Sequence, residues 1–193
     1  MAQSLKQKIS VDLNSVDKDI PVLISERLIM KPLGLDFLSN NYLNWMQDEK
    51  VIKYMGSGGE NYSMQMLKNY LNEVEKKKIF FWAIILKKNK KHIGNIKIDP
   101  INYKNLVGEY GIMIGDKKNW GKGFGKEASK KVINYCFKKL KLRKINLGVI
   151  SHHKDAILLY KSLGFIQEGR FKNHVFFQNR FVDYLWMAIF NKQ

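Results

Sequence analysis

A glycine-rich turn leads directly into a strongly amphipathic segment near the middle of the chain. Residues 119–128 read NWGKGFGKEA, with glycine at positions 121, 123 and 125. Apolar residues then recur every three or four positions over 128–140 while lysines cover the opposite face, which predicts a helix. Glycine permits positive φ angles and close approach of a ligand, and a helix start presents unpaired N–H groups. The junction therefore predicts an anion site, most often for phosphate; the alternative is a tight turn that only needs glycine.

Two common phosphate-binding motifs do not fit this turn. A P-loop requires Gly-x-x-x-x-Gly-Lys-Ser/Thr, but Trp120 stands where its first glycine belongs and Glu127 replaces the Ser/Thr. A dinucleotide-binding turn requires Gly-x-Gly-x-x-Gly and an acidic residue about 20 positions later. The spacing here is Gly-x-Gly-x-Gly, and residues 145–147 are Ile-Asn-Leu. Neither nucleotide-binding class is therefore expected.

Strands and helices alternate along the rest of the chain. Strands are expected as one strand within 22–33 that ends at Pro32, over 80–86, from His92 to Pro100, over 109–115 and 144–150, briefly from Phe165, and over 180–190. Helices are expected after a cap at Asp36, after a cap at Ser63, and over 155–163 with Gly164 as the C-cap. Hairpin-like pairs followed by a strand–helix–strand unit favour a mixed sheet with helices packed on it.

Composition limits the class of protein. The 193 residues predict one domain over 21–193, preceded by a polar extension over 1–20. Cys136 is the single cysteine and lies among apolar residues, so it is expected in the core. The N-terminus lacks the apolar stretch of a secretory signal, and no run of about 20 apolar residues predicts a membrane span. A cytoplasmic location is therefore expected.

The charge is strongly basic but poorly suited to nucleic acid. The formal net charge of +17 favours anionic ligands. Only four of the 34 basic residues are arginines, and the lysines are scattered along the chain. Because arginine is the usual residue for recognising bases and phosphates, nucleic acid is disfavoured as a partner. A homodimer is compatible with the aromatic content of 12%.

Four motifs in the right order resemble the GNAT superfamily of acyl-CoA-dependent N-acetyltransferases. Gly123 and Gly125 match its Arg/Gln-x-x-Gly-x-Gly/Ala signature, and residues 160–165 match its Tyr-x-x-x-Gly-Phe element. Trp120 departs from Arg/Gln. The Trp-Gly-Lys-Gly stretch and the opening SERLIMKPL…NWMQDEKVIKYM are nevertheless similar to the RimJ/RimL-type branch. The resemblance covers residues 22–190.

The resemblance implies a fold and a cosubstrate. The fold is of the α/β (α+β) class, a mixed, mostly antiparallel central sheet of about seven strands flanked by helices. The cosubstrate is acetyl-CoA, without a metal. Its diphosphate would bind the amides of 121–126, and its pantetheine arm would pair with the preceding strand. The residues implied in cofactor binding are Ile112, Met113, Ile114, Trp120, Gly121, Lys122, Gly123, Phe124, Gly125, Lys126, His153, Ala156 and Tyr160. His153 stands where the family commonly has asparagine.

Two residues are candidates for the chemistry. Acyl transfer to an amine needs a group that accepts the proton of the amine, because an amine of pKa near about 10 is mostly protonated at pH 7. The family often carries a carboxylate at the position of Glu109; a solvated charge at a strand end is the alternative. Tyr160 matches the family's general acid toward the thiolate, and simple packing on the helix is its alternative. The amide of Ile114 would stabilise the oxyanion.

The amine acceptor is less constrained by the sequence. Candidates for binding it are Trp45, Asp48, Tyr54 and His174, the last in an expected polar-aromatic loop. Trp45 is alternatively a core residue, and Asp48 a turn cap. The first-ranked acceptor is an amino sugar, including a nucleotide-linked one of a surface-polysaccharide pathway, since a basic pocket disfavours a polycation. The alternatives are a ribosomal or other protein N-terminal amine, or a non-catalytic module that binds coenzyme A or nucleic acid.

Overall fold

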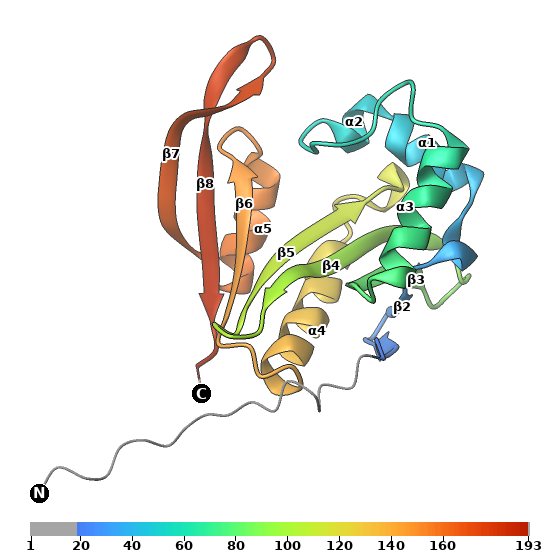
Figure 1. Cartoon of the computed structure of the whole chain (residues 1–193), viewed down its shortest axis with the longest axis horizontal. Coiled ribbons are helices and arrows are strands. Elements are labelled where there is room, and N and C mark those ends of the chain that lie inside the picture. The colour runs from blue at the N-terminus through green and yellow to red at the C-terminus, as the bar shows by residue number, and fades with distance from the viewer. Residues whose placement is uncertain (1–18, 193) are drawn as a thin grey trace, which may run out of the picture.

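The computed structural model describes residues 19–192, and it shows a central sheet with helices on both faces (Figure 1). Most of the predicted extension, residues 1–20, lies outside the described residues; at its end, Ile20 packs against the core. Within the described part of the chain, no helix has the length and apolar character needed to cross a membrane.

Eight strands form one sheet in the order β1-β2-β3-β4-β5-β6-β8-β7. The strands are β1 Leu23–Ile24, β2 Leu28–Pro32, β3 Phe80–Leu86, β4 His92–Asn102, β5 Val107–Ile114, β6 Lys144–Ile150, β7 Ile166–Phe177 and β8 Arg180–Phe190. Neighbouring strands are antiparallel except β5 and β6, which are parallel. The predicted mixed, mostly antiparallel sheet is therefore confirmed.

Two helical layers cover the sheet (Figure 1). The helices are α1 Asn40–Gln47, α2 Glu49–Ile52, α3 Met64–Lys76, α4 Phe124–Lys138 and α5 Lys154–Leu163. α4 and α5 share one hydrophobic cluster with the sheet, while α1 and α3 share the other. In β3, residues 80, 82 and 84 belong to the first cluster, and residues 81, 83 and 85 to the second. A strand that is covered on both faces reads as apolar throughout, which explains the sequence FFWAIIL.

Two predictions for the N-terminal part were wrong. Asp36 does not cap a long helix, because it lies in the short 3-10 helix Leu35–Phe37. α1 starts only after Ser39, whose Oγ accepts a hydrogen bond from the Tyr42 N–H at 3.3 Å. The segment expected as one strand within 22–33 is a hairpin of β1 and β2, and it supplies the strand beyond the expected number.

Two further predictions, on strand ends, were also wrong. β4 continues past Pro100 to Asn102, because its pairing with β5 shifts between Ile98 and Ile101. Such an irregularity accommodates a proline, which has no N–H to donate to a neighbouring strand. β7 has 12 residues instead of being short, so His174 lies in a strand and not in a loop. β7 is an edge strand that is exposed almost throughout, so it shows no apolar alternation in the sequence.

Candidate functional site

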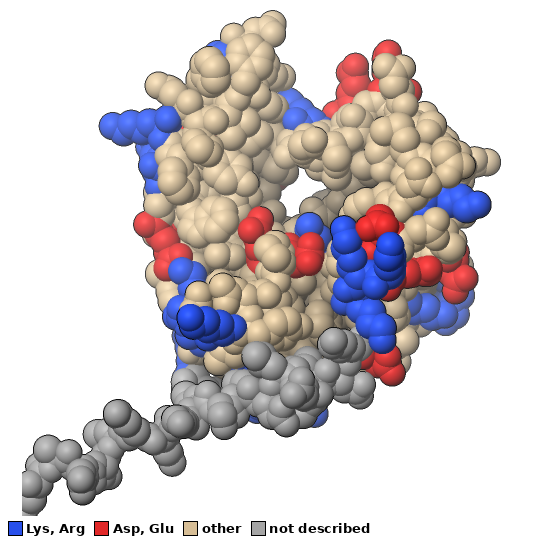
Figure 2. All heavy atoms as spheres, in the orientation of Figure 1, with Lys and Arg blue, Asp and Glu red and all other residues tan. Residues whose placement is uncertain are grey.

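β5 and β6 separate after a short paired segment, which splits the middle of the sheet. Their parallel pairing ends with Glu109 opposite Asn146. Among the described strands, residues 110–114 have a partner only in β4, and residues 147–150 only in β8. Figure 1 shows the two strands diverging, and Figure 2 shows an opening through the molecule at the same place. An edge left without a strand partner can pair with an extended ligand arm.

The glycine-rich turn follows the end of β5 and leads into α4. Gly121 and Gly123 have φ angles of 72° and 78°, which residues with a Cβ rarely adopt. Gly123 is the N-cap of α4 and offers no side chain to the first N–H groups of the helix. A Cβ at Gly121 would meet only open space. Open space, available N–H groups and the partial positive charge of a helix start fit the diphosphate of coenzyme A.

Trp120 holds this turn against β5. Its Nε1–H donates a hydrogen bond of 2.6 Å to the carbonyl oxygen of Ile114, while the residue stays 44% exposed. The indole therefore takes up a backbone acceptor of β5 that was expected to be free for the pantetheine arm. Holding the turn is the role that the structure assigns to the residue that replaces the Arg/Gln of the signature.

Glu109 lies half-buried at the last paired position of the split. Its neighbour Tyr110 bonds to Ser129 of α4 at 2.7 Å, so Glu109 faces the opposite side of the sheet, away from α4. None of the ion pairs among the described residues includes Glu109. Opposite it, the Oδ1 of Asn146 is buried and has no hydrogen-bond partner in the described part of the chain. Both groups remain available to a ligand.

Tyr184 of β8 reaches across β6 toward the same place. A Cβ on Gly148 would lie 2.1 Å from the Tyr184 Oη, so only glycine at 148 leaves room for this phenol. Burial and, to a lesser extent, the charge of Glu109 raise the pKa of Tyr184. Glu109, Asn146 and Tyr184 therefore bring three polar groups together beside the split.

Tyr160 lies on α5 in an aromatic environment. It is only 9% exposed, and its ring centroid is 5.8 Å from that of Tyr110 and 5.9 Å from that of Phe165. Burial, with a smaller contribution from Tyr184, raises the pKa of Tyr160 to about 12. The phenol is therefore protonated at neutral pH and can donate a hydrogen bond.

An aromatic stack connects the segment after α2 with the C-terminal half. The ring of Tyr54 stacks on His153 at 3.9 Å and on Phe177 at 5.2 Å. Burial lowers the pKa of His153; the charge of Asp155 opposes this effect, and that of Lys53 adds to it. A predicted acceptor residue, Tyr54, and a predicted cofactor residue, His153, thus belong to one stack. Among the described residues, no group of three His, Cys, Asp or Glu side chains is placed to hold a metal.

Trp45 and Asp48 have surroundings that match their structural alternatives. Trp45 is 8% exposed in the second hydrophobic cluster, and a Cβ on Gly115 would lie 2.1 Å from its indole. Asp48 accepts a hydrogen bond of 3.0 Å from the Lys50 N–H at the start of α2. It also pairs with Lys117, whose hydrogen bond lowers the pKa of Asp48. Trp45 therefore packs the core and Asp48 caps a helix.

The remaining predicted residues belong to β5, α4, α5 and β7. Ile112 and Ile114 of β5 and Phe124 of α4 pack at the edge of the first cluster, and Ala156 of α5 is buried in it. Met113 packs against the second cluster. Gly125 lies in the first turn of α4, where a Cβ would make ordinary contacts at 3.7–3.8 Å, and Lys126 is next to it. His174 is exposed, with its ring 6.0 Å from that of Tyr184.

Asn146 and Arg27 were not among the site residues predicted from the sequence. Asn146 gave a signal, since it interrupts the apolar run that follows Lys144 in the strand KINLGVI. Arg27 gave none, because its partner Glu127 is 100 positions away.

Comparison with known proteins shows the family to which this chain belongs. A family model described as acetyltransferase (GNAT) domain matches residues 27–166, and the chain belongs to that family. The protein is therefore an N-acetyltransferase that uses acetyl-CoA.

Individual relatives agree with this assignment. The chain is 27% identical over 177 residues to the uncharacterized N-acetyltransferase p20 of Bacillus licheniformis, which covers 89% of this chain and 97% of that protein. It is 33% identical over 97 residues to spermidine N(1)-acetyltransferase of Vibrio cholerae, over 50% of this chain and 56% of that one. A GNAT-family acetyltransferase structure from Bacillus anthracis has a TM-score of 0.79 at 21% identity, covering 90% of this chain and all (100%) of that one. The Vibrio cholerae spermidine N-acetyltransferase in complex with CoA and spermine has a TM-score of 0.77 at 25% identity, over 85% and 95% of the two chains.

Proposed function

We propose that this enzyme transfers the acetyl group directly to a primary amine, with Glu109 as the base. The observation that carries this proposal is the position of Glu109, half-buried at the last paired position of the split and outside the ion pairs of the described residues. A primary amine of pKa near about 10 must lose a proton before it attacks. Glu109 takes this proton directly or through a water molecule.

Tyr160 serves the other side of the reaction. Its pKa of about 12 lies above that of a thiol, about 8.5, so complete proton transfer to the leaving thiolate is uphill. A hydrogen bond from the phenol that strengthens as charge develops is the role that fits. Acetyl-CoA supplies the activated acyl group. Cys136 is fully buried, which supports direct transfer without a covalent intermediate on the enzyme.

Tyr184 and Asn146 orient the acceptor. Both lie beside Glu109, and the free Oδ1 of Asn146 can accept a hydrogen bond from the amine. His174, near Tyr184, extends this polar surface toward β7.

We propose an amino sugar as the acceptor, with a nucleotide-linked form as the leading case. Rings flanked by a few polar groups are typical of small-molecule sites, and the rings of Tyr54, His153 and His174 lie around the split. Figure 2 shows uncharged residues on the side walls of the opening and Lys or Arg atoms above it. Such walls suit a hydroxyl-rich ligand better than a polycation. The net charge of +17 adds attraction for phosphate.

A polyamine is the second candidate acceptor, because two of the relatives are named for spermidine. Against it, Asp48 is already neutralised by Lys117, so this carboxylate is not free to hold a second cationic amine. Four predictions from the sequence remain predictions: the RimJ/RimL-type branch, a protein N-terminal amine as acceptor, the cytoplasmic location and the homodimer.

The homodimer is tested by sedimentation of the wild type and of a Phe176→Ser variant, since Phe176 is 64% exposed on β7.

A thiol-release screen tests the proposal. Acetyl-CoA is mixed with enzyme and with nucleotide-linked amino sugars, free amino sugars, spermidine, or peptides with a free N-terminus. We expect the largest kcat/KM with an amino sugar and a loss of turnover in Glu109→Gln. A larger kcat/KM with spermidine than with any amino sugar would favour the polyamine as the acceptor. Full activity of Glu109→Gln would refute the role of this carboxylate.

A further inference from the structure

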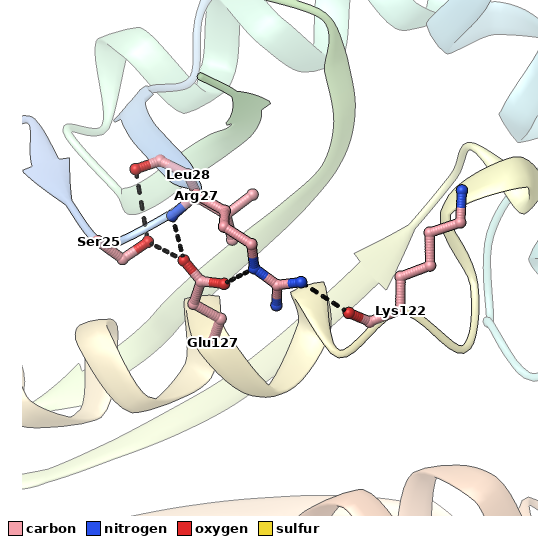
Figure 3. Close-up of polar contacts among 5 residues, drawn as sticks. All are labelled: Ser25, Arg27, Leu28, Lys122 and Glu127. Carbon is pink, nitrogen blue, oxygen red and sulfur yellow. Dashed lines mark hydrogen bonds and ion pairs between the residues drawn. The ribbon is translucent and has the colours of Figure 1, made fainter. Parts of the chain in front are cut away.

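We infer that Arg27 is a positioning residue for the phosphate-binding turn. The inference rests on the proposed binding of the coenzyme A diphosphate at residues 121–126. Arg27 lies in the tight turn between β1 and β2, and Figure 3 shows its guanidinium group between Glu127 of α4 and the backbone of Lys122. It thereby connects the N-terminal hairpin to both the turn and the first part of α4.

The first set of contacts fixes a carboxylate at the start of α4. Oε2 of Glu127 accepts a hydrogen bond from Arg27 Nε at 2.7 Å. Oε1 accepts from the Arg27 backbone N–H at 2.7 Å and from Ser25 Oγ at 2.7 Å. Burial alone would raise the pKa of Glu127, but these hydrogen bonds and the charge of Arg27 lower it, so Glu127 stays ionised. An unpaired carboxylate in the first turn of α4 would repel a phosphate bound at the helix start, and the pairing of Glu127 with Arg27 removes that repulsion.

The second contact fixes the direction of a backbone N–H. Nη1 of Arg27 donates a hydrogen bond of 3.1 Å to the carbonyl oxygen of Lys122. The peptide bond between Lys122 and Gly123 is trans, so its N–H points away from its carbonyl oxygen. Arg27 therefore directs the Gly123 N–H to the side of the turn opposite to the guanidinium. Glycine allows the backbone at 121 and 123, where φ is positive, to change conformation easily. The contact with Arg27 restrains this motion.

A third contact holds the guanidinium itself. The Arg27 Cζ lies 4.5 Å from the centroid of the Phe124 ring, over its face. Phe124 is the first residue of α4, so helix start, turn and hairpin share one side chain. Because the Arg27 side chain is 45% exposed, its pairing contributes little to global stability. Its effect is expected mainly on ligand affinity.

The test compares coenzyme A binding by calorimetry in full-length variants. Arg27→Met keeps the aliphatic stem but removes the fork, and we expect the Kd for coenzyme A to rise about ten-fold, with a higher KM for acetyl-CoA and kcat within about two-fold. Arg27→Lys keeps the charge but cannot reach Glu127 and Lys122 together, so an intermediate Kd is expected. Hydrogen exchange of the Gly123 and Phe124 amides should accelerate in free Arg27→Met. The matched control is Arg143→Met, an arginine whose Nε donates to the Asn105 carbonyl at 2.9 Å, and it should change none of these values.

Charge and positioning are separated by a double variant. In Arg27→Met/Glu127→Gln the repulsive carboxylate is gone, but the Lys122 carbonyl is still not held by Arg27. The affinity for coenzyme A should therefore recover only in part. Complete recovery of the affinity for coenzyme A would mean that Arg27 only neutralises Glu127, and it would overturn the inference. The loss in Arg27→Met should be equal for coenzyme A and 3′-dephospho-coenzyme A; a loss confined to the former means direct contact with the ligand and also overturns it. Unchanged Kd values in Arg27→Met and Arg27→Lys refute the inference alone, whereas a wild type that does not bind coenzyme A refutes the proposed site.

Discussion

Replacing Gly148 by alanine tests the packing of Tyr184 across β6. The added Cβ would lie 2.1 Å from the Tyr184 Oη and 2.3 Å from both Cε1 and Cζ, so the whole ring has to move. Overpacking of this kind costs about 1–3 kcal/mol. At about 2–4 °C per kcal/mol for a domain of this size, Tm should fall by roughly 2–12 °C. Because the displaced phenol leaves its place beside Glu109, the KM for the amine should also rise.

Two matched variants make this test specific. Gly169→Ala adds a Cβ at an ordinary 3.7 Å from Trp186. It should leave the free energy of unfolding unchanged or raise it by about 0.4–1 kcal/mol, so Tm should not fall. Gly148→Ala/Tyr184→Ala should recover part of the lost stability, since the clash is removed. Thermal unfolding and steady-state kinetics supply both readouts. Equal Tm values for Gly148→Ala and Gly169→Ala would show that Tyr184 does not occupy this space.

The chemistry, the phenol of Tyr160 and the thiol of Cys136 give three more predictions. Glu109→Gln should lower kcat by about 10²–10⁴-fold with an unchanged calorimetric Kd for coenzyme A; a large loss of affinity instead would place Glu109 in cofactor binding. The pKa of Tyr160 is about 12 in the folded protein and about 10 in the unfolded chain. Its stabilising contribution is therefore complete below pH ~10 and is lost as pH rises toward 12. Between pH 8 and 11 the wild type should lose more Tm than Tyr160→Phe, and equal losses would contradict the burial of this phenol. Burial raises the pKa of Cys136, so a thiol reagent should label it only in denaturant, and fast labelling of native protein would place it at the surface.

Most elements with strong periodicity were predictable. β6 and β8 match their predicted ranges, and α5 differs by one residue, because each carries either a strand alternation or a helical stripe. Gly164 has φ of 98° and ends α5 as expected of a glycine C-cap. Element ends were harder where local rules compete. Ser39 and Asp36 are both good caps, and the helix that starts after Ser39 places Tyr42 and Trp45 in the second hydrophobic cluster.

Glu109 and Tyr160 were predicted through the family resemblance; without it, the candidate site was predictable only where it depends on local backbone. The glycine turn was found because positive φ angles strongly favour glycine, and Gly121 and Gly123 stand in the sequence itself. Tyr184 over Gly148 depends on the register of β6 and β8, and Arg27 on Glu127 joins segments 100 residues apart. Such contacts are set by tertiary packing, and no local pattern encodes them.

Because β5 and β6 separate in the middle of the sheet, the passage between them opens on both faces of the sheet. In the proposed reaction, donor and acceptor enter this passage from opposite sides and meet at Glu109, so neither one blocks the other's route. The amide product and the free thiol can then depart independently. A molecule that joins an acceptor amine to coenzyme A would have to pass through the whole opening to inhibit the enzyme.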